Sequence, residues 1–325
     1  MYLSLIKDKL FEQAEVYNRV KRGDSSSVQY KKLYDAKWGT RDENYTNRNR
    51  LVHYLLYAHI DDEQIILFLF EEEIKDRQTN SFQGIGESLN VLTTILQRYN
   101  ISGKYNKFFE TAKNANFDCA CGYDAGFLID DDINSLDIMD CIYLAQKLDY
   151  KDIMDLMVRE WKADITEWTD SVRTDLIRFN SFLGKDQENE MQYRELLKKA
   201  LKKGRIFDIV SAYNNIIELN IKGKKFEIGY SYLKEMIETV DFTDILEIRL
   251  FSSVLEESFE IICGFPQVSK ELWSWSKSYL VKMDRRQMFG NLYEKAIAAA
   301  KCCEDPCAAQ LEQDYILWKN EIGLK

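Results

Sequence analysis

The residues best suited to chemistry lie in one segment, Asn114 to Gln146, which contains no lysine or arginine. It carries seven aspartates: Asp118, Asp124, Asp130, Asp131, Asp132, Asp137 and Asp140. Seven like charges repel one another unless basic groups approach from elsewhere in the fold or from a partner. The whole chain has 54 acidic and 44 basic residues, a net charge of −10, so this segment supplies most of the imbalance.

Large apolar residues are interleaved with these carboxylates, among them Tyr123, Phe127 and Leu128. An aromatic anchor surrounded by carboxylates is suited to binding a basic protein surface. We therefore predict a partner-binding surface made of Asp118, Tyr123, Asp124, Phe127, Asp130, Asp131, Asp132, Asp137 and Asp140. The alternative is that the aromatic residues only hold a long loop against the core.

Catalytic chemistry has weaker support in the sequence. The triplet Asp130–Asp132 could bind a divalent metal in a helical hydrolase, or could simply form an acidic helix N-terminus. His53 and His59, the only histidines, are six positions apart, so they cannot share a metal as an i, i+4 pair does. Neither a nucleophile elbow nor a phosphate-binding Gly-Lys-Ser/Thr is present. We expect no enzymatic activity, no metal and no cofactor.

The seven cysteines are irregularly spaced and odd in number, which does not indicate a disulfide framework. Cys119 and Cys121 form one cluster, and Cys302, Cys303 and Cys307 form another. Neither has the paired Cys-x-x-Cys spacing of structural zinc, and a shared site would require the clusters to meet in space. Small buried residues with a redox-sensitive thiol are the favoured interpretation.

Composition also limits the partners. An acidic isoelectric point near 5.0 argues against nucleic acid, whose phosphates require a basic face. The longest aliphatic and aromatic run, Ile65–Phe70, has six residues, whereas a membrane span needs about 20. The N-terminus, Met1–Lys9, becomes charged too early for a secretory signal. We therefore expect no membrane partner and a cytoplasmic protein.

With only two prolines and 14 glycines, the chain has too few turn residues for a β-rich fold, so we predict an all-α protein. Residues 39–49 and 117–126 are expected to be non-helical. A further helix should carry Tyr30, Leu33 and Tyr34, and Asp132 should cap the helix that begins at Ile133. The other predicted helices cover about 3–22, 51–60, 61–75, 81–99, 105–112, 151–161, 165–183, 188–203, 205–221, 224–240, 242–262, 267–283, 285–303 and 307–322.

Between residues 188 and 262 the helical hairpins recur every 35 to 38 residues, near the period of tetratricopeptide repeats. Small residues such as Ala296 and Ala300 precede a closing Pro306. In architecture the chain resembles tetratricopeptide-like helical-repeat proteins. The resemblance implies a stacked helix-hairpin array, an α-solenoid of the TPR or HEAT kind, forming a single domain over 1–325. A softer seam is expected near Gly184, between an N-terminal half, 1–183, with the acidic loop 114–132, and C-terminal hairpins, 185–325.

In overall character, acidic and without a catalytic set, the chain is similar to the immunity proteins that bacteria pair with secreted toxins. That resemblance implies a non-enzymatic inhibitor that covers the basic active cleft of a toxin, for example a nuclease, with carboxylates standing in for phosphates. The alternative is a peptide-binding or scaffolding repeat protein with its ligand in a concave groove.

Overall fold

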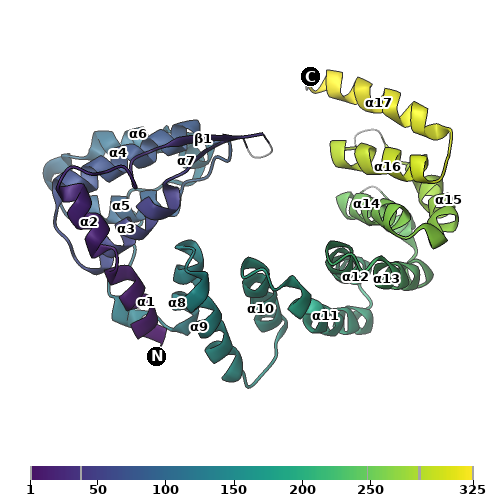
Figure 1. Ribbon diagram of the computed structural model, residues 1–325, viewed down its shortest axis with the longest axis horizontal. Helices are drawn as coiled ribbons and strands as arrows, with labels where there is room; N and C mark the ends of the chain where they lie inside the picture. The colour runs from purple at the N-terminus through teal and green to yellow at the C-terminus, as the bar shows by residue number, and fades with distance from the viewer. Residues whose placement is uncertain (1, 37–38, 247, 285–286, 324–325) are drawn as a thin grey trace. The chain divides into compact units, whose positions relative to one another are not determined.

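The computed structural model describes residues 2–36, 39–246, 248–284 and 287–323 (Figure 1). It is predominantly helical, with a single two-stranded sheet among the described residues, which confirms the predicted all-α class. The chain divides into two compact units, residues 1–166 and 167–325. The repeat array and the seam near Gly184 stay predictions.

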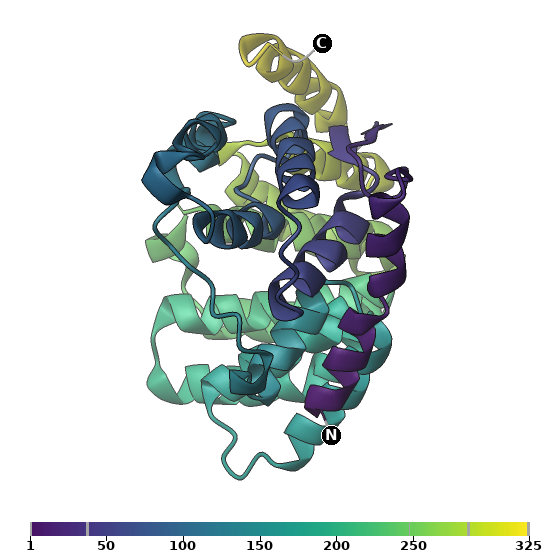
Figure 2. The same ribbon diagram turned by 90° about the vertical axis from the view of Figure 1, so that its left-hand side faces the viewer.

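Unit 1 has its core among α3, α4 and α5, joined by side chains from α2, α6 and α7. Helix α1 packs against α3, α8 and α9, and Figures 1 and 2 both show it beside the teal helices α8 and α9. The elements of this unit are α1 (Tyr2–Phe11), α2 (Ala14–Lys21), β1 (Lys32–Asp35), β2 (Gly39–Asp42), α3 (Tyr45–Tyr57), α4 (Glu63–Thr79), α5 (Glu87–Gln97), η1 (Ile101–Gly103), α6 (Asn106–Lys113), α7 (Phe117–Gly122), η2 (Ile133–Ser135), α8 (Ile138–Lys147) and α9 (Lys151–Ala163).

Unit 2 is a succession of helices that pack mainly on their neighbours in sequence, while α14 also packs on α12 and α16. Its core extends from α11 to α16, and α17 covers one end of it. The elements are α10 (Asp170–Phe182), η3 (Asp186–Asn189), α11 (Glu190–Lys203), α12 (Ile206–Lys222), α13 (Phe226–Thr239), η4 (Phe242–Ile245), α14 (Arg249–Gly264), η5 (Pro266–Val268), α15 (Ser269–Leu280), α16 (Gly290–Cys302) and α17 (Cys307–Glu321).

The predicted helix through Tyr30, Leu33 and Tyr34 is wrong. This stretch forms β1, which pairs antiparallel with β2 in the register Lys32↔Asp42. The backbone amides that a helix would satisfy internally are instead bonded by distant carboxylates. The N–H of Tyr30 donates to Glu72 at 2.6 Å, and that of Lys31 donates to Asp42 at 2.9 Å. The predicted connection at 39–49 likewise contains β2 and the start of α3.

Other predicted boundaries shift for local reasons. The first predicted helix breaks after Phe11 into α1 and α2. The helix expected to begin near Ser81 begins only at Glu87, because Ser81 is bonded to the hairpin: its N–H donates to Thr40 O at 2.8 Å. The helix expected from 242 is first the short η4 and becomes α14 at Arg249. Residues 247 and 285–286, inside two predicted helices, lie outside the described residues.

Candidate functional site

The acidic segment, residues 114–146, starts with a short helix that the sequence did not predict. Asn116 caps α7, its Oδ1 accepting the N–H of Cys119 at 2.8 Å. Residues 117–122 are therefore helical, whereas 123–132 form the predicted loop. A side-chain acceptor at the N-cap satisfies an amide that an α-helix leaves unpaired, which explains a helix of only six residues here.

Asp137 and Asp140 open helix α8 with a reciprocal pair of hydrogen bonds. The N–H of Asp140 donates to Asp137 Oδ1 at 2.9 Å, and the N–H of Asp137 donates to Asp140 Oδ2 at 3.1 Å. This capping box places two exposed carboxylates at the positive end of the helix dipole. We predicted Asp132 as the N-cap of this helix, and that prediction is wrong. The N-cap is Asp137, because Asp132 caps the separate 3-10 helix η2.

The loop aspartates bond mainly to backbone amides and hydroxyls. Asp130 accepts the N–H of Asp132 and the hydroxyl of Ser135, both at 3.0 Å, and these bonds lower the pKa of Asp130. Asp132 accepts the N–H of Asn134 at 2.9 Å, and Asp124 accepts that of Gly126 at 2.8 Å. A neutral donor orients a carboxylate without cancelling its charge, so the loop keeps its negative charge.

One aspartate of the segment is compensated by a cation from another element. Asp131 forms an ion pair with Arg98 and lies 3.6 Å from His59 Nδ1. Asp118 accepts the N–H of Gly84 at 2.6 Å. Within the described parts of the chain, Asp131 is the only one of the seven aspartates with a cationic group within 4 Å. Six carboxylates thus lack an ion-pair partner there.

The triplet Asp130–Asp132 is not gathered around one point, because its carboxylates bond to Ser135, Arg98 and Asn134. Across the ranges that the structure describes, no group of three or more His, Cys, Asp or Glu side chains could hold a metal ion. The hypothesis of a metal-dependent hydrolase stays untested and has no geometric support.

The apolar residues of the segment divide into two sets. Tyr123 is only 3% exposed, and its hydroxyl lies 2.7 Å from Thr93 Oγ1. Burial raises the pKa of Tyr123 to about 12. We predicted Tyr123 as a partner contact, but the structure places it in the core. Phe117, Phe127 and Leu128, by contrast, are 70%, 61% and 58% exposed, so they do not pin the loop.

A groove of about 1020 Å³ borders the segment, between α6 and the turn that follows α7. Its lining includes Phe109 and Glu110 from α6 and Cys121 and Asp124 from the segment. Lys113 donates to the carbonyl oxygen of Tyr123 at 2.7 Å across it, which fixes the start of the loop. The acidic loop is therefore held at both ends, by Lys113 and by the capping box of α8.

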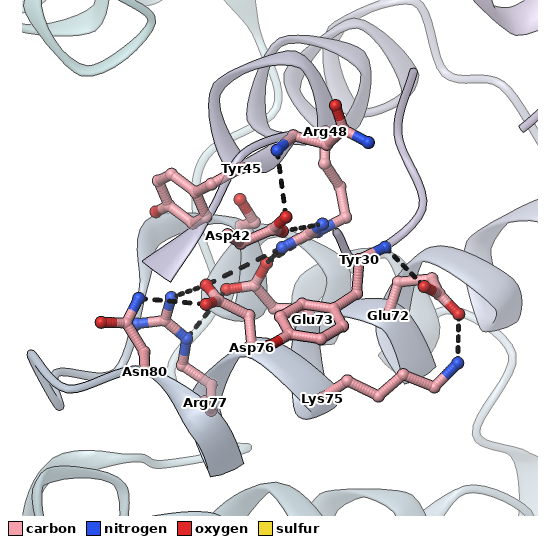
Figure 3. A network of polar contacts seen from close by, with 12 residues as sticks. Tyr30, Asp42, Tyr45, Arg48, Glu72, Glu73, Lys75, Asp76, Arg77 and Asn80 are labelled. Atoms are coloured by element: carbon pink, nitrogen blue, oxygen red, sulfur yellow. Dashed lines mark hydrogen bonds and ion pairs between the residues drawn. The ribbon is translucent and has the colours of Figure 1, made fainter. Parts of the chain in front are cut away.

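A buried network of charged side chains lies among β2, α3 and α4 (Figure 3). Arg48 of α3 lies between Asp42 at the end of β2 and Glu73 of α4, with N–O distances of 2.6 and 2.9 Å. Arg77 pairs with Asp76 and, at 3.2 Å, with Glu73. Burial lowers the pKa of Arg48, but Glu73 and Asp42 reverse this, so its pKa is raised and it stays charged. The network joins the hairpin to α3 and α4.

The same network reaches the acidic segment through Arg77. Its Nη1 donates to the carbonyl oxygen of Gln83 at 3.3 Å, and its own carbonyl oxygen accepts from Asn116 Nδ2 at 3.0 Å. Asn116 also donates to Gly84 O, while the N–H of Gly84 bonds to Asp118. None of these residues could be recognised from the sequence as a support of the acidic segment. The i, i+4 spacing of Glu73 and Arg77 is a signal, but it does not distinguish a buried pair from a surface pair.

The protein-family models, the curated proteins and the solved structures contain no match to this chain. Among the described residues, none of the helices combines the length and apolar character that a membrane span requires.

Proposed function

We propose that this protein binds a basic protein through the acidic face, defined here as Phe117, Asp124, Phe127, Leu128, Asp130, Asp132, Asp137 and Asp140. In its most concrete form, it is an immunity or inhibitor protein that neutralises a basic toxin by covering the toxin's active cleft. The observation that carries the proposal is the combination of exposed large apolar side chains with carboxylates that have no cation within 4 Å among the described residues.

Two physical effects support this function. Uncompensated surface charge accelerates encounter with a partner of opposite charge, by about 10- to 1000-fold at low ionic strength. Full burial of a large apolar side chain, such as Phe127 or Leu128, contributes about 1.5–3 kcal/mol to the free energy of binding. These side chains would form the apolar centre of the contact. The loop hydrogen bonds hold the carboxylates in place before binding, so less conformational freedom is lost when the complex forms.

The test begins with the partner captured from the native source and compares two variants of equal charge change. The triple variant Asp124→Asn, Asp130→Asn, Asp132→Asn keeps the Oδ1 acceptors of the loop but removes three charges. We expect its association rate constant to fall about tenfold at low salt, with a weaker dependence on salt concentration. The measurement is stopped-flow association at several ionic strengths.

The matched control neutralises three exposed acids of unit 2, Glu188→Gln, Glu227→Gln and Glu238→Gln. It changes the net charge equally and should alter the association rate constant by less than about twofold. A partner with no basic face, or equal effects of the two variants, would refute the acidic face as the binding site. If the partner is a toxin, adding the protein should abolish its activity at a one-to-one ratio.

Peptide binding by unit 2 is a second candidate, favoured by a cleft of about 380 Å³ among α15, α16 and α17. Apolar side chains dominate its lining, including the exposed Val281 and Leu317. Val281→Asp and Leu317→Asp should impair peptide binding and leave association through the acidic face unchanged. Loss of partner binding in these variants would favour this candidate.

A further inference from the structure

Cys263 and Cys302 are 39 residues apart in sequence, but their Sγ atoms are 3.4 Å apart. Cys263 lies in the last turn of α14, and Cys302 is the last residue of α16. The two helices pack directly on each other, so the sulfur atoms are held together by the core of unit 2. Both cysteines are exposed residues, although the thiol of Cys263 is partly shielded from water, so small reagents can reach the pair.

The geometry favours this pair over the other cysteines of the cluster. A disulfide has a bond of about 2.05 Å, so the two sulfur atoms must approach by about 1.4 Å, within reach of rotation about two side-chain bonds. Cys303 points elsewhere, donating from its Sγ to the carbonyl oxygen of Ser269 at 3.5 Å. Cys263 also lines a cavity of about 410 Å³, so this residue borders open space on one side.

We propose that Cys263 and Cys302 form a redox-active dithiol that low-molecular-weight disulfides, such as glutathione disulfide, convert into a disulfide. In the first step Cys302 gives its proton to water and its sulfur attacks one sulfur of glutathione disulfide, the S–S bond of the reagent breaks, and one glutathione thiolate leaves. In the second step Cys263 gives its proton to water and attacks Sγ of Cys302, releasing the second glutathione. The two protein thiols are oxidised by two electrons, and the glutathione disulfide is reduced to two glutathione thiols.

The protonation of Cys263 leaves the first attack to Cys302. Burial and the hydrogen bond from Cys302 raise the pKa of Cys263 to about 12, so at neutral pH it is a thiol rather than an attacking thiolate. Once Cys302 carries a glutathione, it can no longer donate this hydrogen bond, which removes one of the causes that raise the pKa of Cys263, and the two sulfur atoms are already neighbours. The disulfide would tie the end of α14 to the end of α16, across the connection that contains α15.

The test uses the reduced full-length protein, incubated with glutathione disulfide at neutral pH and then alkylated. Before alkylation, intact mass should show a product lighter by two hydrogen atoms; after unfolding and alkylation, the oxidised protein should carry two fewer alkyl groups than the reduced protein, which has seven cysteines. Proteolysis without reductant should yield one cross-linked peptide pair, containing Cys263 and Cys302. The oxidised protein should also unfold at a higher urea concentration than the reduced protein, because the cross-link restricts the unfolded chain.

Three variants make the test specific. Cys263→Ser should stop at a stable glutathione adduct on Cys302, and Cys302→Ser should give no intramolecular disulfide. Cys121→Ser, which removes an exposed thiol in unit 1, should leave the reaction unchanged. A stable glutathione adduct on the unaltered protein, a linkage that involves Cys303 or Cys307, or no reaction would overturn the proposal.

Discussion

At the scale of single residues, Glu257 is the most unusual group in unit 2. Its side chain is buried on α14, and burial together with Glu218 and Glu260 raises its pKa well above the ordinary value of 4.5. Lys295 opposes this, but its ammonium group already bonds Glu256 and Glu260, at 2.8 and 2.6 Å. The folded protein therefore holds this proton more tightly than the unfolded chain does.

The sign of the pH dependence follows from that difference. Below the unfolded pKa, near 4.5, both states bind the proton and Glu257 carries no penalty. As the pH rises from there through the folded pKa, the unfolded state loses its proton first, so the free energy of unfolding falls. Glu257→Gln keeps the shape and removes the charge. At pH 8 we expect it to raise the free energy of unfolding by about 1 kcal/mol or more, and at pH 4 to leave it nearly unchanged.

Urea unfolding at both pH values measures this prediction. Glu256→Gln is the control, because Glu256 pairs with Lys295 at 2.8 Å and its neutralisation should not stabilise unit 2. If Glu257→Gln raised the free energy of unfolding equally at pH 4 and pH 8, the stabilisation would not come from the ionisation of Glu257.

At the scale of elements, the buried charge network fixes the loop before α5. Gly86 has φ of +82°, and a Cβ there would lie 2.6 Å from Glu73 Oε1 and 3.1 Å from Arg77 Cζ. Gly23 has φ of +95°, with nothing within 4 Å of such a Cβ. Alanine at either glycine carries a backbone strain of roughly 1–2 kcal/mol, but only Gly86→Ala must also displace the network.

We therefore expect Gly86→Ala to lower the free energy of unfolding of unit 1 by about 2 kcal/mol more than Gly23→Ala does, since disrupting buried ion pairs is costly. Urea unfolding of the two variants gives the difference. The acidic segment should become more mobile in Gly86→Ala, with faster amide exchange in α7, because Arg77 supports Asn116. Equal destabilisation by the two substitutions would mean that the buried ion pairs can rearrange around the added methyl group without a loss of stability.

At the scale of the whole molecule, the two compact units meet in sequence at residue 166, whereas we predicted a seam near Gly184. Helix α10 lies between these positions and packs against η3 and α11 of unit 2. Its Leu176 and Phe179 are buried, and Asn180 Nδ2 donates to Asn189 Oδ1 at 2.8 Å. Burial of two such apolar side chains contributes roughly 3–6 kcal/mol.

We expect a fragment of residues 167–325 to fold by itself, because the core from α11 to α16 lies entirely within it. A fragment of residues 185–325 lacks α10 and should be less stable by at least about 3 kcal/mol. Far-ultraviolet circular dichroism and urea unfolding compare the two. Equal stability of the two fragments would favour the seam near Gly184.

Much of the helical architecture could be predicted, because it depends on neighbours in sequence. Asp62 accepts the N–H of Ile65 at 3.3 Å at the start of α4, within two residues of the predicted start of this helix at 61. The hairpin could not be predicted from local pattern, since Glu72 bonds the backbone of Tyr30 from 42 positions away. For the candidate site, the sequence located the aspartates, but it did not predict that Tyr123 is buried or that Arg98 pairs with Asp131.

By itself, the sequence determined that the chain is helical and that one segment is rich in aspartate and free of lysine and arginine. Helical periodicity and local charge are properties of residues within a few positions of one another. Only the tertiary structure decided which carboxylates keep their charge uncompensated, which aromatic rings face outward, and that Cys263 meets Cys302. Those outcomes depend on contacts between residues that are distant in the chain, and a local pattern contains no information about such contacts.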